Sequence, residues 1–169
     1  GTAQNLALLG KGEAEVIFAD GLYFFAYEGK GTFEGKPMKE LRGLVPLYAE
    51  PIHFLVAKGS NIKSIQDLKG KRVSVGAVGS GTEVTVRTLL KVAGLDPDKD
   101  IKPENLGLSD TAGAFADKNI DAALTVGALG IAGVVEITTL GTAEFRDIPA
   151  DIVAKLGKEL PYYLPFDIP

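Results

Sequence analysis

The sequence contains no cysteine and only one histidine, His53, among its 169 residues. Without cysteine the chain can form neither disulfides nor thiolate metal sites, and no carboxylate cluster or histidine pair takes their place. Lysine and arginine are not grouped into a basic block, and the formal net charge is −4, which argues against binding to nucleic acid. We therefore expect no metal, no cofactor and no nucleic-acid partner.

Long apolar runs are missing as well. The longest are far shorter than the ~20 residues that cross a bilayer. No charged segment followed by an apolar one marks a signal peptide. We therefore expect no direct insertion into a membrane. The composition itself, 46% hydrophobic and 24% charged, is typical of globular domains.

Apolar periodicity predicts the secondary structure: short β-branched runs predict strands, and apolar residues at helical spacing predict helices. The predicted strands cover residues 14–20, 43–48, 52–57, 72–76, 105–107, 120–126 and 144–148. The predicted helices cover residues 4–11, 21–28, 82–93, 109–119, 128–140 and 149–160. From residue 71 onward strands and helices alternate, which predicts an α/β fold with a parallel sheet and helices on both faces.

A boundary between two lobes is expected near residues 55–64, where an extended run leaves through Lys58, Gly59 and Ser60. Residues 1–59 would form part of a first lobe and residues 60–160 a second lobe. Residues 161–169 would form a strand that returns toward the first lobe. Two extended connections between α/β lobes would act as a hinge.

The segment Gly79-Ser80-Gly81-Thr82 lies between a predicted strand and a predicted helix. Its spacing does not fit the dinucleotide-binding G-x-G-x-x-G pattern, the Walker loop or the nucleophile elbow. What remains is a helix start with unpaired backbone amides and two hydroxyl groups, which favours an anion such as a carboxylate. The alternative is a capped strand-to-helix turn without a ligand.

Other residues are candidates for contact with a ligand. Asp20 follows a predicted strand and would either cap the next helix or face a ligand. Asn5 falls in the first turn of a helix, and Tyr23 belongs either to the core or to a cleft. Gly127 follows the predicted strand 120–126, at a carboxyl end where open α/β sheets bind ligands. No base, nucleophile or matched acid–base pair accompanies these residues.

The order of these segments resembles the TAXI family (TRAP-associated extracytoplasmic immunogenic proteins), the solute-binding proteins of TRAP transporters. The resemblance rests on NLALLGKGEA, on Asp20 with the later AYEG, on Leu41-Arg42, and on DLKGKRVSVGAVGSGT. The later segments KNIDAALTVG and PYYLPFDIP also match, so that the resemblance covers essentially the whole chain.

The resemblance implies a periplasmic-binding-protein-like fold of type II, in which two α/β lobes close on a small carboxylate such as glutamate, glutamine or 2-oxoglutarate. It implies a periplasmic or other extracytoplasmic location, no enzymatic activity, and delivery of the ligand to the membrane permease subunits of a TRAP transporter. The implied ligand-binding residues are Asn5, Asp20, Tyr23, Gly79, Ser80, Gly81, Thr82, Thr125 and Gly127.

The chain departs from this family at its two ends. The family pattern has a strand and a tyrosine-bearing turn before residue 1 and a further segment after residue 169, so we expect the first lobe to be incomplete. Two alternatives to solute binding stay open. One is a small-molecule enzyme of similar α/β architecture that holds a carboxylate at residues 79–82, and the other is a surface fragment without ligand activity.

Overall fold

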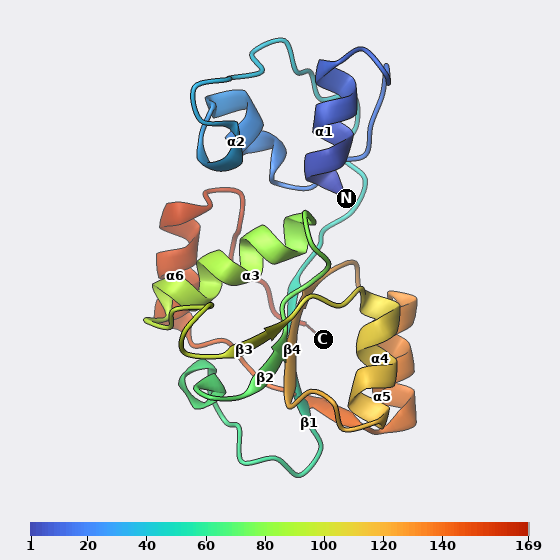
Figure 1. Cartoon of the computed structure of the whole chain (residues 1–169), viewed down its shortest axis with the longest axis vertical. Helices are drawn as coiled ribbons and strands as arrows, with labels where there is room; N and C mark the ends of the chain where they lie inside the picture. Colours follow the sequence, from blue (N-terminus) through green and yellow to red (C-terminus); the bar gives the residue numbers. More distant parts are fainter. Residues whose placement is uncertain (169) are drawn as a thin grey trace.

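The computed structural model describes residues 1–168 and shows a mixed α/β chain (Figure 1). Its helices are α1 (Thr2–Gly10), α2 (Tyr23–Glu28), α3 (Gly81–Val92), α4 (Leu108–Ala116), α5 (Ala132–Leu140) and α6 (Ala150–Glu159), with short 3-10 turns η1 (Gly31–Phe33) and η2 (Ile65–Leu68). Its strands are β1 (Ile52–Ala57), β2 (Arg72–Ser74), β3 (Lys102–Glu104), β4 (Ala122–Val126) and β5 (Ala143–Phe145).

The five strands form one sheet in the order β3-β2-β4-β1-β5. Strand β2 runs parallel to β3 and β4, whereas β1 runs antiparallel to both β4 and β5. The strands after residue 71 therefore share one direction, as the alternating pattern predicts. The sheet as a whole is mixed, because the earlier strand β1 is inserted between β4 and β5.

The position of β1 corrects one sequence-based assignment. Residues 52–57 were expected in the first lobe, but β1 pairs with β4 over most of its length and with β5 at its end. The predicted boundary at residues 59/60 therefore falls after an interior strand of the five-stranded sheet, and the part of the chain that forms this sheet begins at Ile52. A strand's assignment to a sheet depends on pairing with distant segments, which local sequence does not specify.

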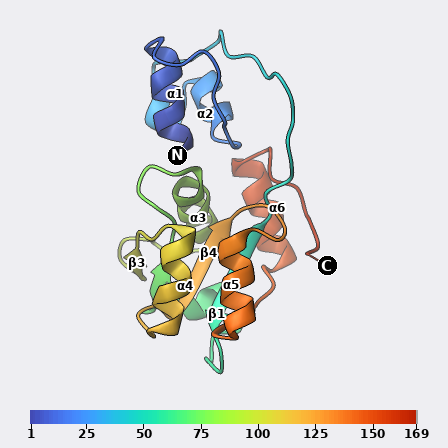
Figure 2. The ribbon, with the colours of Figure 1, turned by 90° about the vertical axis from the view of Figure 1, so that its right-hand side faces the viewer.

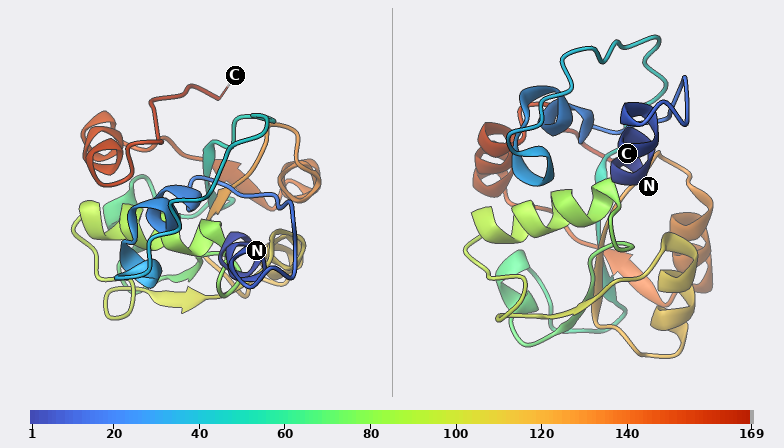
Figure 3. Two further views of the ribbon diagram at one scale, coloured as in Figure 1. Left: turned by 90° about the horizontal axis from the view of Figure 1, so that it is seen from above. Right: turned by 45° about the horizontal axis from the view of Figure 1, so that its top comes forward.

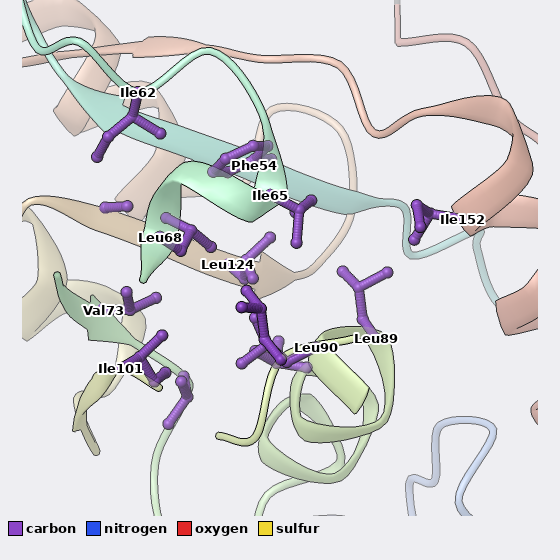
Figure 4. Close-up of a cluster of buried hydrophobic side chains, with 14 of the residues drawn as sticks. Phe54, Ile62, Ile65, Leu68, Val73, Leu89, Leu90, Ile101, Leu124 and Ile152 are labelled. Carbon is purple, nitrogen blue, oxygen red and sulfur yellow. The ribbon is translucent and has the colours of Figure 1, made fainter. Parts of the chain in front are cut away.

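The larger core lies between the sheet and the helices α3 and α6 (Figure 4). Phe54 and Leu124 contribute to it from adjacent strands, and Leu89 and Leu90 of α3 face them, each at most 1% exposed. Burying each of these side chains stabilises the fold by roughly 1.5–3 kcal/mol. Because side chains alternate along a strand, Leu55 points the other way, into a second core under α4 and α5.

Ser64 and Asp67 form a capping box at the start of η2. The Asp67 carboxylate accepts hydrogen bonds from the backbone amide of Ser64 at 2.9 Å and from its hydroxyl group at 3.1 Å. The hydrogen bond from the amide of Lys63, followed by the two from Ser64, lowers the pKa of Asp67. The turn fixes Ile65 and Leu68 in the larger core.

Helices α1 and α2 form a separate layer beyond α3, and residues 41–51 lead from that layer to β1 as an extended trace (Figure 2). The segments 14–20, 43–48 and 161–168 contain no strand, contrary to the prediction of strands at 14–20 and 43–48 and of a returning strand at 161–169. Apolar side chains of these segments stay exposed, as in Phe18 at 74%. A strand needs a partner strand, and the described residues provide none for these segments. Residue 169, the last of the predicted returning strand, lies outside the described residues.

The strand predicted at residues 105–107 lies instead at 102–104, as β3. The remaining helices and strands lie within a few residues of their predicted bounds. The sheet positions the carboxyl ends of β2 and β4 beneath the start of α3 and the α1–α2 layer (Figure 3).

Candidate anion-binding site at the start of α3

The turn between β2 and α3 has the geometry of a helix start with a side-chain cap. Ser80 is the N-cap residue in an extended conformation, and its hydroxyl oxygen accepts a hydrogen bond from the amide of Glu83 at 3.1 Å. Gly76 and Gly79 have φ values of 94° and 72°, which favour glycine. At Gly76 a side chain would also collide with Thr82. The glycines thus allow the tight approach of the loop to α3.

Part of the donor set expected for a ligand is already used within the protein. The amide of Gly79 donates to the carboxylate of Glu83 at 2.8 Å, and the amide of Ser80 donates to the carbonyl of Ala77 at 3.1 Å. The amides of Gly81 and Thr82 donate to no acceptor within residues 1–168. These two amides, at the positive end of a helix of twelve residues, are therefore the donors left for an anion.

Asp20 reaches this helix start from the segment before α2. Its carboxylate lies against Gly81, where an added Cβ atom would overlap it. The same carboxylate accepts a hydrogen bond from the amide of Leu22 at 2.9 Å, and the amide of Asp20 donates to the hydroxyl of Thr2 at 3.3 Å. Asp20 therefore supports the turn into α2 and also faces the candidate site, so both sequence-based interpretations describe part of its role.

A pocket of about 2240 Å³ opens between the α1–α2 layer, residues 41–51 and the chain after α6. Asn5, Asp20 and Tyr23 line it, together with Glu50 and Tyr162. Residues 79–82 are not part of its lining. The pocket and the helix start therefore meet at Asp20, which contacts both.

Aromatic side chains from the end of the chain form a wall of this pocket. The hydroxyl groups of Tyr163 and Thr85 are 3.2 Å apart, which joins this wall to α3. Burial, offset in part by this hydrogen bond, raises the pKa of Tyr163 to about 12. Burial and then the nearby charge of Asp20 raise the pKa of Glu50. The pocket thus combines this aromatic wall with the carboxyl groups of Asp20 and Glu50.

The other sequence-predicted site residues lie in different surroundings. The side-chain amide of Asn5 donates to the carbonyl of Phe18 at 2.9 Å, and so it ties α1 to the segment after it. Tyr23 is 50% exposed at the pocket edge. Thr125 is buried in β4 opposite His53, and the amide of Gly127 donates to the carbonyl of Pro51 at 3.3 Å.

His53 itself is 1% exposed, and its Nδ1 atom has no partner within residues 1–168. Burial lowers its pKa. His53 does not line the pocket. It packs within a strand, as the sequence predicts.

Sequence reasoning missed the polar residues that surround the loop. Glu83, Arg87 and Asn105 form a hydrogen-bonded group beside Gly79. Glu83 at the fourth position after a loop glycine could have been interpreted as a partner for the loop amides, whereas Asn105 is far away in the sequence and carried no signal. Among the described residues there is no group of three or more acidic or histidine side chains suited to a metal, and no helix with the length and apolar character to cross a bilayer.

Comparison with known proteins assigns the fold. A model of the NMT1-like family matches residues 1–169, the whole chain. Among solved structures, a protein from Bordetella bronchiseptica RB50 is 22% identical with a TM-score of 0.62, over 95% of this chain and 47% of that one.

Two further structures match a smaller part. The periplasmic aliphatic sulphonate binding protein SsuA from Escherichia coli is 29% identical over 57% of this chain and 33% of its own, with a TM-score of 0.47. A putative sulfonate-binding SsuA from Methylobacillus flagellatus KT is 26% identical over 59% of this chain and 29% of its own, with a TM-score of 0.49. The chain thus spans less than half the length of each of these three structures. The predicted α/β fold class is confirmed, because one five-stranded sheet is covered by helices on both faces.

Proposed function

The chain belongs to the NMT1-like family, and from this premise we propose that it is part of an extracytoplasmic solute-binding protein. The start of α3 would hold the acid group of a small carboxylate, and closure of two lobes would enclose it. One observation carries the proposal: the amides of Gly81 and Thr82 lack an acceptor within residues 1–168, while a carboxylate, that of Asp20, lies against this helix start. A second acid group would meet the same favourable dipole.

Asp20 narrows the choice among glutamate, glutamine and 2-oxoglutarate. It forms no ion pair with any described residue. A ligand that brings only negative charge would be repelled by Asp20, whereas a ligand with an ammonium group beside its carboxylate would pair with it. Within this set the geometry therefore favours the amino acids over the keto acid.

A further question is which type of transporter the protein serves. We propose, from the resemblance to the TAXI family, that the protein serves the permease subunits of a TRAP transporter. The competing transporter type is the ABC transporter, to which the sulfonate-binding protein from Methylobacillus flagellatus KT belongs by its name. Growth-linked uptake assays in a strain that lacks one transporter type at a time would separate the two.

The alternative of an enzyme gains no support from the described residues. A bound acid at α3 would need a base or nucleophile beside it. His53 is buried in β1 outside the pocket lining, and the Ser80 hydroxyl oxygen accepts a hydrogen bond from the helix as a cap. We therefore propose binding rather than catalysis.

The test is a double variant, Ser80→Ala/Thr82→Ala, in the full-length parent protein. Calorimetry with glutamate, glutamine and 2-oxoglutarate is expected to show affinity for the best ligand reduced about tenfold, because two hydroxyl groups at the helix start are lost. Ser109→Ala/Thr139→Ala, which changes the same residue types at positions of α4 and α5 away from the loop, is the matched control. Unchanged affinity in the first variant would refute the role of the loop.

A further inference from the structure

We propose that Glu83 and Asn105 are positioning residues that hold the loop 76–80 in one shape and direct a ligand to the amides of Gly81 and Thr82. This inference rests on the proposed function, since it concerns how the same site is built. It adds to that function two side chains that do not touch the ligand, and it explains why the amide of Gly79 is not a ligand donor.

The Glu83 carboxylate gathers three donors. Its Oε2 atom accepts the amide of Gly79 at 2.8 Å. Its Oε1 atom accepts the side-chain amide of Asn105 at 3.1 Å and the Nε–H group of Arg87 at 3.2 Å. A carboxylate has room for these bonds on its two oxygens, and charged acceptors make stronger hydrogen bonds than neutral ones. The Gly79 amide is therefore committed to Glu83.

Asn105 connects this carboxylate to the other end of the loop. Its side-chain nitrogen also donates to the carbonyl of Gly76 at 2.9 Å. Residue 105 follows β3 directly, and the amide of Val75 donates to the carbonyl of Glu104 at 3.0 Å, so that Asn105 stands on the edge of the sheet. One side chain thus ties the first residue of the loop and the first turn of α3 to the sheet.

The positive charge of Arg87 opposes the negative charge of Glu83 within the same group. The Nε atom of Arg87 lies 3.2 Å from Oε1 of Glu83, and its Nη1 atom lies 2.7 Å from Oδ1 of Asp98. The Glu83 side chain is 16% exposed, so the Arg87 charge opposes it at short range with little intervening water. Arg87 therefore offsets part of the negative charge that Glu83 places beside the site of the anion, since the same guanidinium also pairs with Asp98.

The consequence for binding is preorganisation. A loop with two glycines at positive φ has many accessible conformations, and ordering it when the ligand arrives would reduce affinity. Here hydrogen bonds to Glu83 and Asn105 order the loop in the free protein. The Gly81 and Thr82 amides then face the ligand in a fixed arrangement.

The test uses the neutral substitution Asn105→Ala in the full-length parent, with Asn119→Ala as matched control. Asn119 is exposed after α4 and lies far from the loop in the sheet topology. Hydrogen exchange at the Gly79 amide is expected to accelerate about tenfold in Asn105→Ala only, with affinity for the tightest of glutamate, glutamine and 2-oxoglutarate reduced by about the same factor.

A second variant, Glu83→Ala/Arg87→Ala, removes the acceptor of the Gly79 amide while it keeps the local net charge, and the same two changes are expected. Exchange at Gly79 equal to that of the control, or affinity unchanged despite faster exchange, overturns the proposal. If the wild-type protein binds none of the three compounds, the proposal that it binds glutamate, glutamine or 2-oxoglutarate is wrong. The exchange rate at Gly79 then still decides whether Glu83 and Asn105 hold the loop.

Discussion

The carboxylate of Asp20 and the Cα atom of Gly81 are in direct contact, so closely that a Cβ atom at residue 81 would occupy the same space. The contact joins the segment before α2 to the first residue of α3, and it depends on the absence of a side chain at position 81. A negative group at the positive end of a helix is stabilised there. The same place is where the proposed ligand brings its own acid group.

Replacing Asp20 by asparagine is expected to change which ligand is preferred. The amide side chain keeps an acceptor for the backbone amide of Leu22, a bond of 2.9 Å in the structure, but the charge is removed. Affinity for 2-oxoglutarate should rise and affinity for glutamate should fall, each by about fivefold, the size of a screened ionic contact worth ~1 kcal/mol. Calorimetry with both compounds measures the ratio.

The matched control for this prediction is Asp117→Asn, at the exposed end of α4. It should leave both affinities unchanged. If Asp20→Asn moves the two affinities in the same direction, Asp20 does not distinguish an ammonium group from a keto group.

Replacing Gly81 by Ala is expected to separate Asp20 from α3 without weakening the sheet. The methyl group overlaps the carboxylate, so that Asp20 must move, while alanine itself favours the helix by up to ~1 kcal/mol. Hydrogen exchange at the Leu22 amide, whose acceptor is Asp20, should accelerate, and carboxylate affinity should fall about tenfold.

Gly113→Ala on α4 is the control, because nothing lies within 4 Å of its Cβ position. A Gly81→Ala variant with unaltered exchange at Leu22 would show that the Asp20 contact is dispensable for the turn into α2.

His53 makes stability depend on pH in a defined window. The unfolded chain titrates this histidine near 6.5, whereas burial lowers its pKa in the folded chain. Between these two values the unfolded state binds more protons, so stability is lost as the pH falls below about 6.5. Urea unfolding at about pH 7.5 and about pH 5 should show a larger loss for the wild type than for His53→Gln.

Asp67, Asp96, Asp100 and Asp121 have pKa values lowered from 3.8, and the stability that they contribute is lost only at lower pH. Glu50, whose pKa is raised by burial, changes stability in the opposite direction to His53, but it is present in both proteins, so the difference between them reports His53. Equal losses in the wild type and His53→Gln would mean that His53 accepts a proton in the folded state without cost.

Much of the fold after residue 51 could be predicted from the sequence. The predicted strand 52–57 coincides with β1, and the helix predicted at 82–93 lies at Gly81–Val92. In each case the signal is local, since apolar spacing and capping residues act within a few positions of the chain.

The segments 14–20 and 43–48 carry the same kind of apolar pattern, yet they form no strand. Residues with strand propensity form a strand only when they pair with a neighbouring strand, and the described residues provide no such strand there. For the candidate site, the sequence predicted the helix start and its two hydroxyl groups. It did not predict that Glu83 takes the Gly79 amide, or that Asn105 reaches the loop from β3.

The sequence alone therefore determined the local elements, the glycine-rich entry to α3 and the absence of thiolate chemistry. Tertiary structure decided that β1 lies between β4 and β5, that Asp20 contacts Gly81, and which amides stay unpaired among residues 1–168. The physical reason is distance along the chain. Helices, caps and turns follow from interactions over a few residues, whereas strand order and the meeting of residues 20, 81 and 105 depend on packing between segments tens of residues apart.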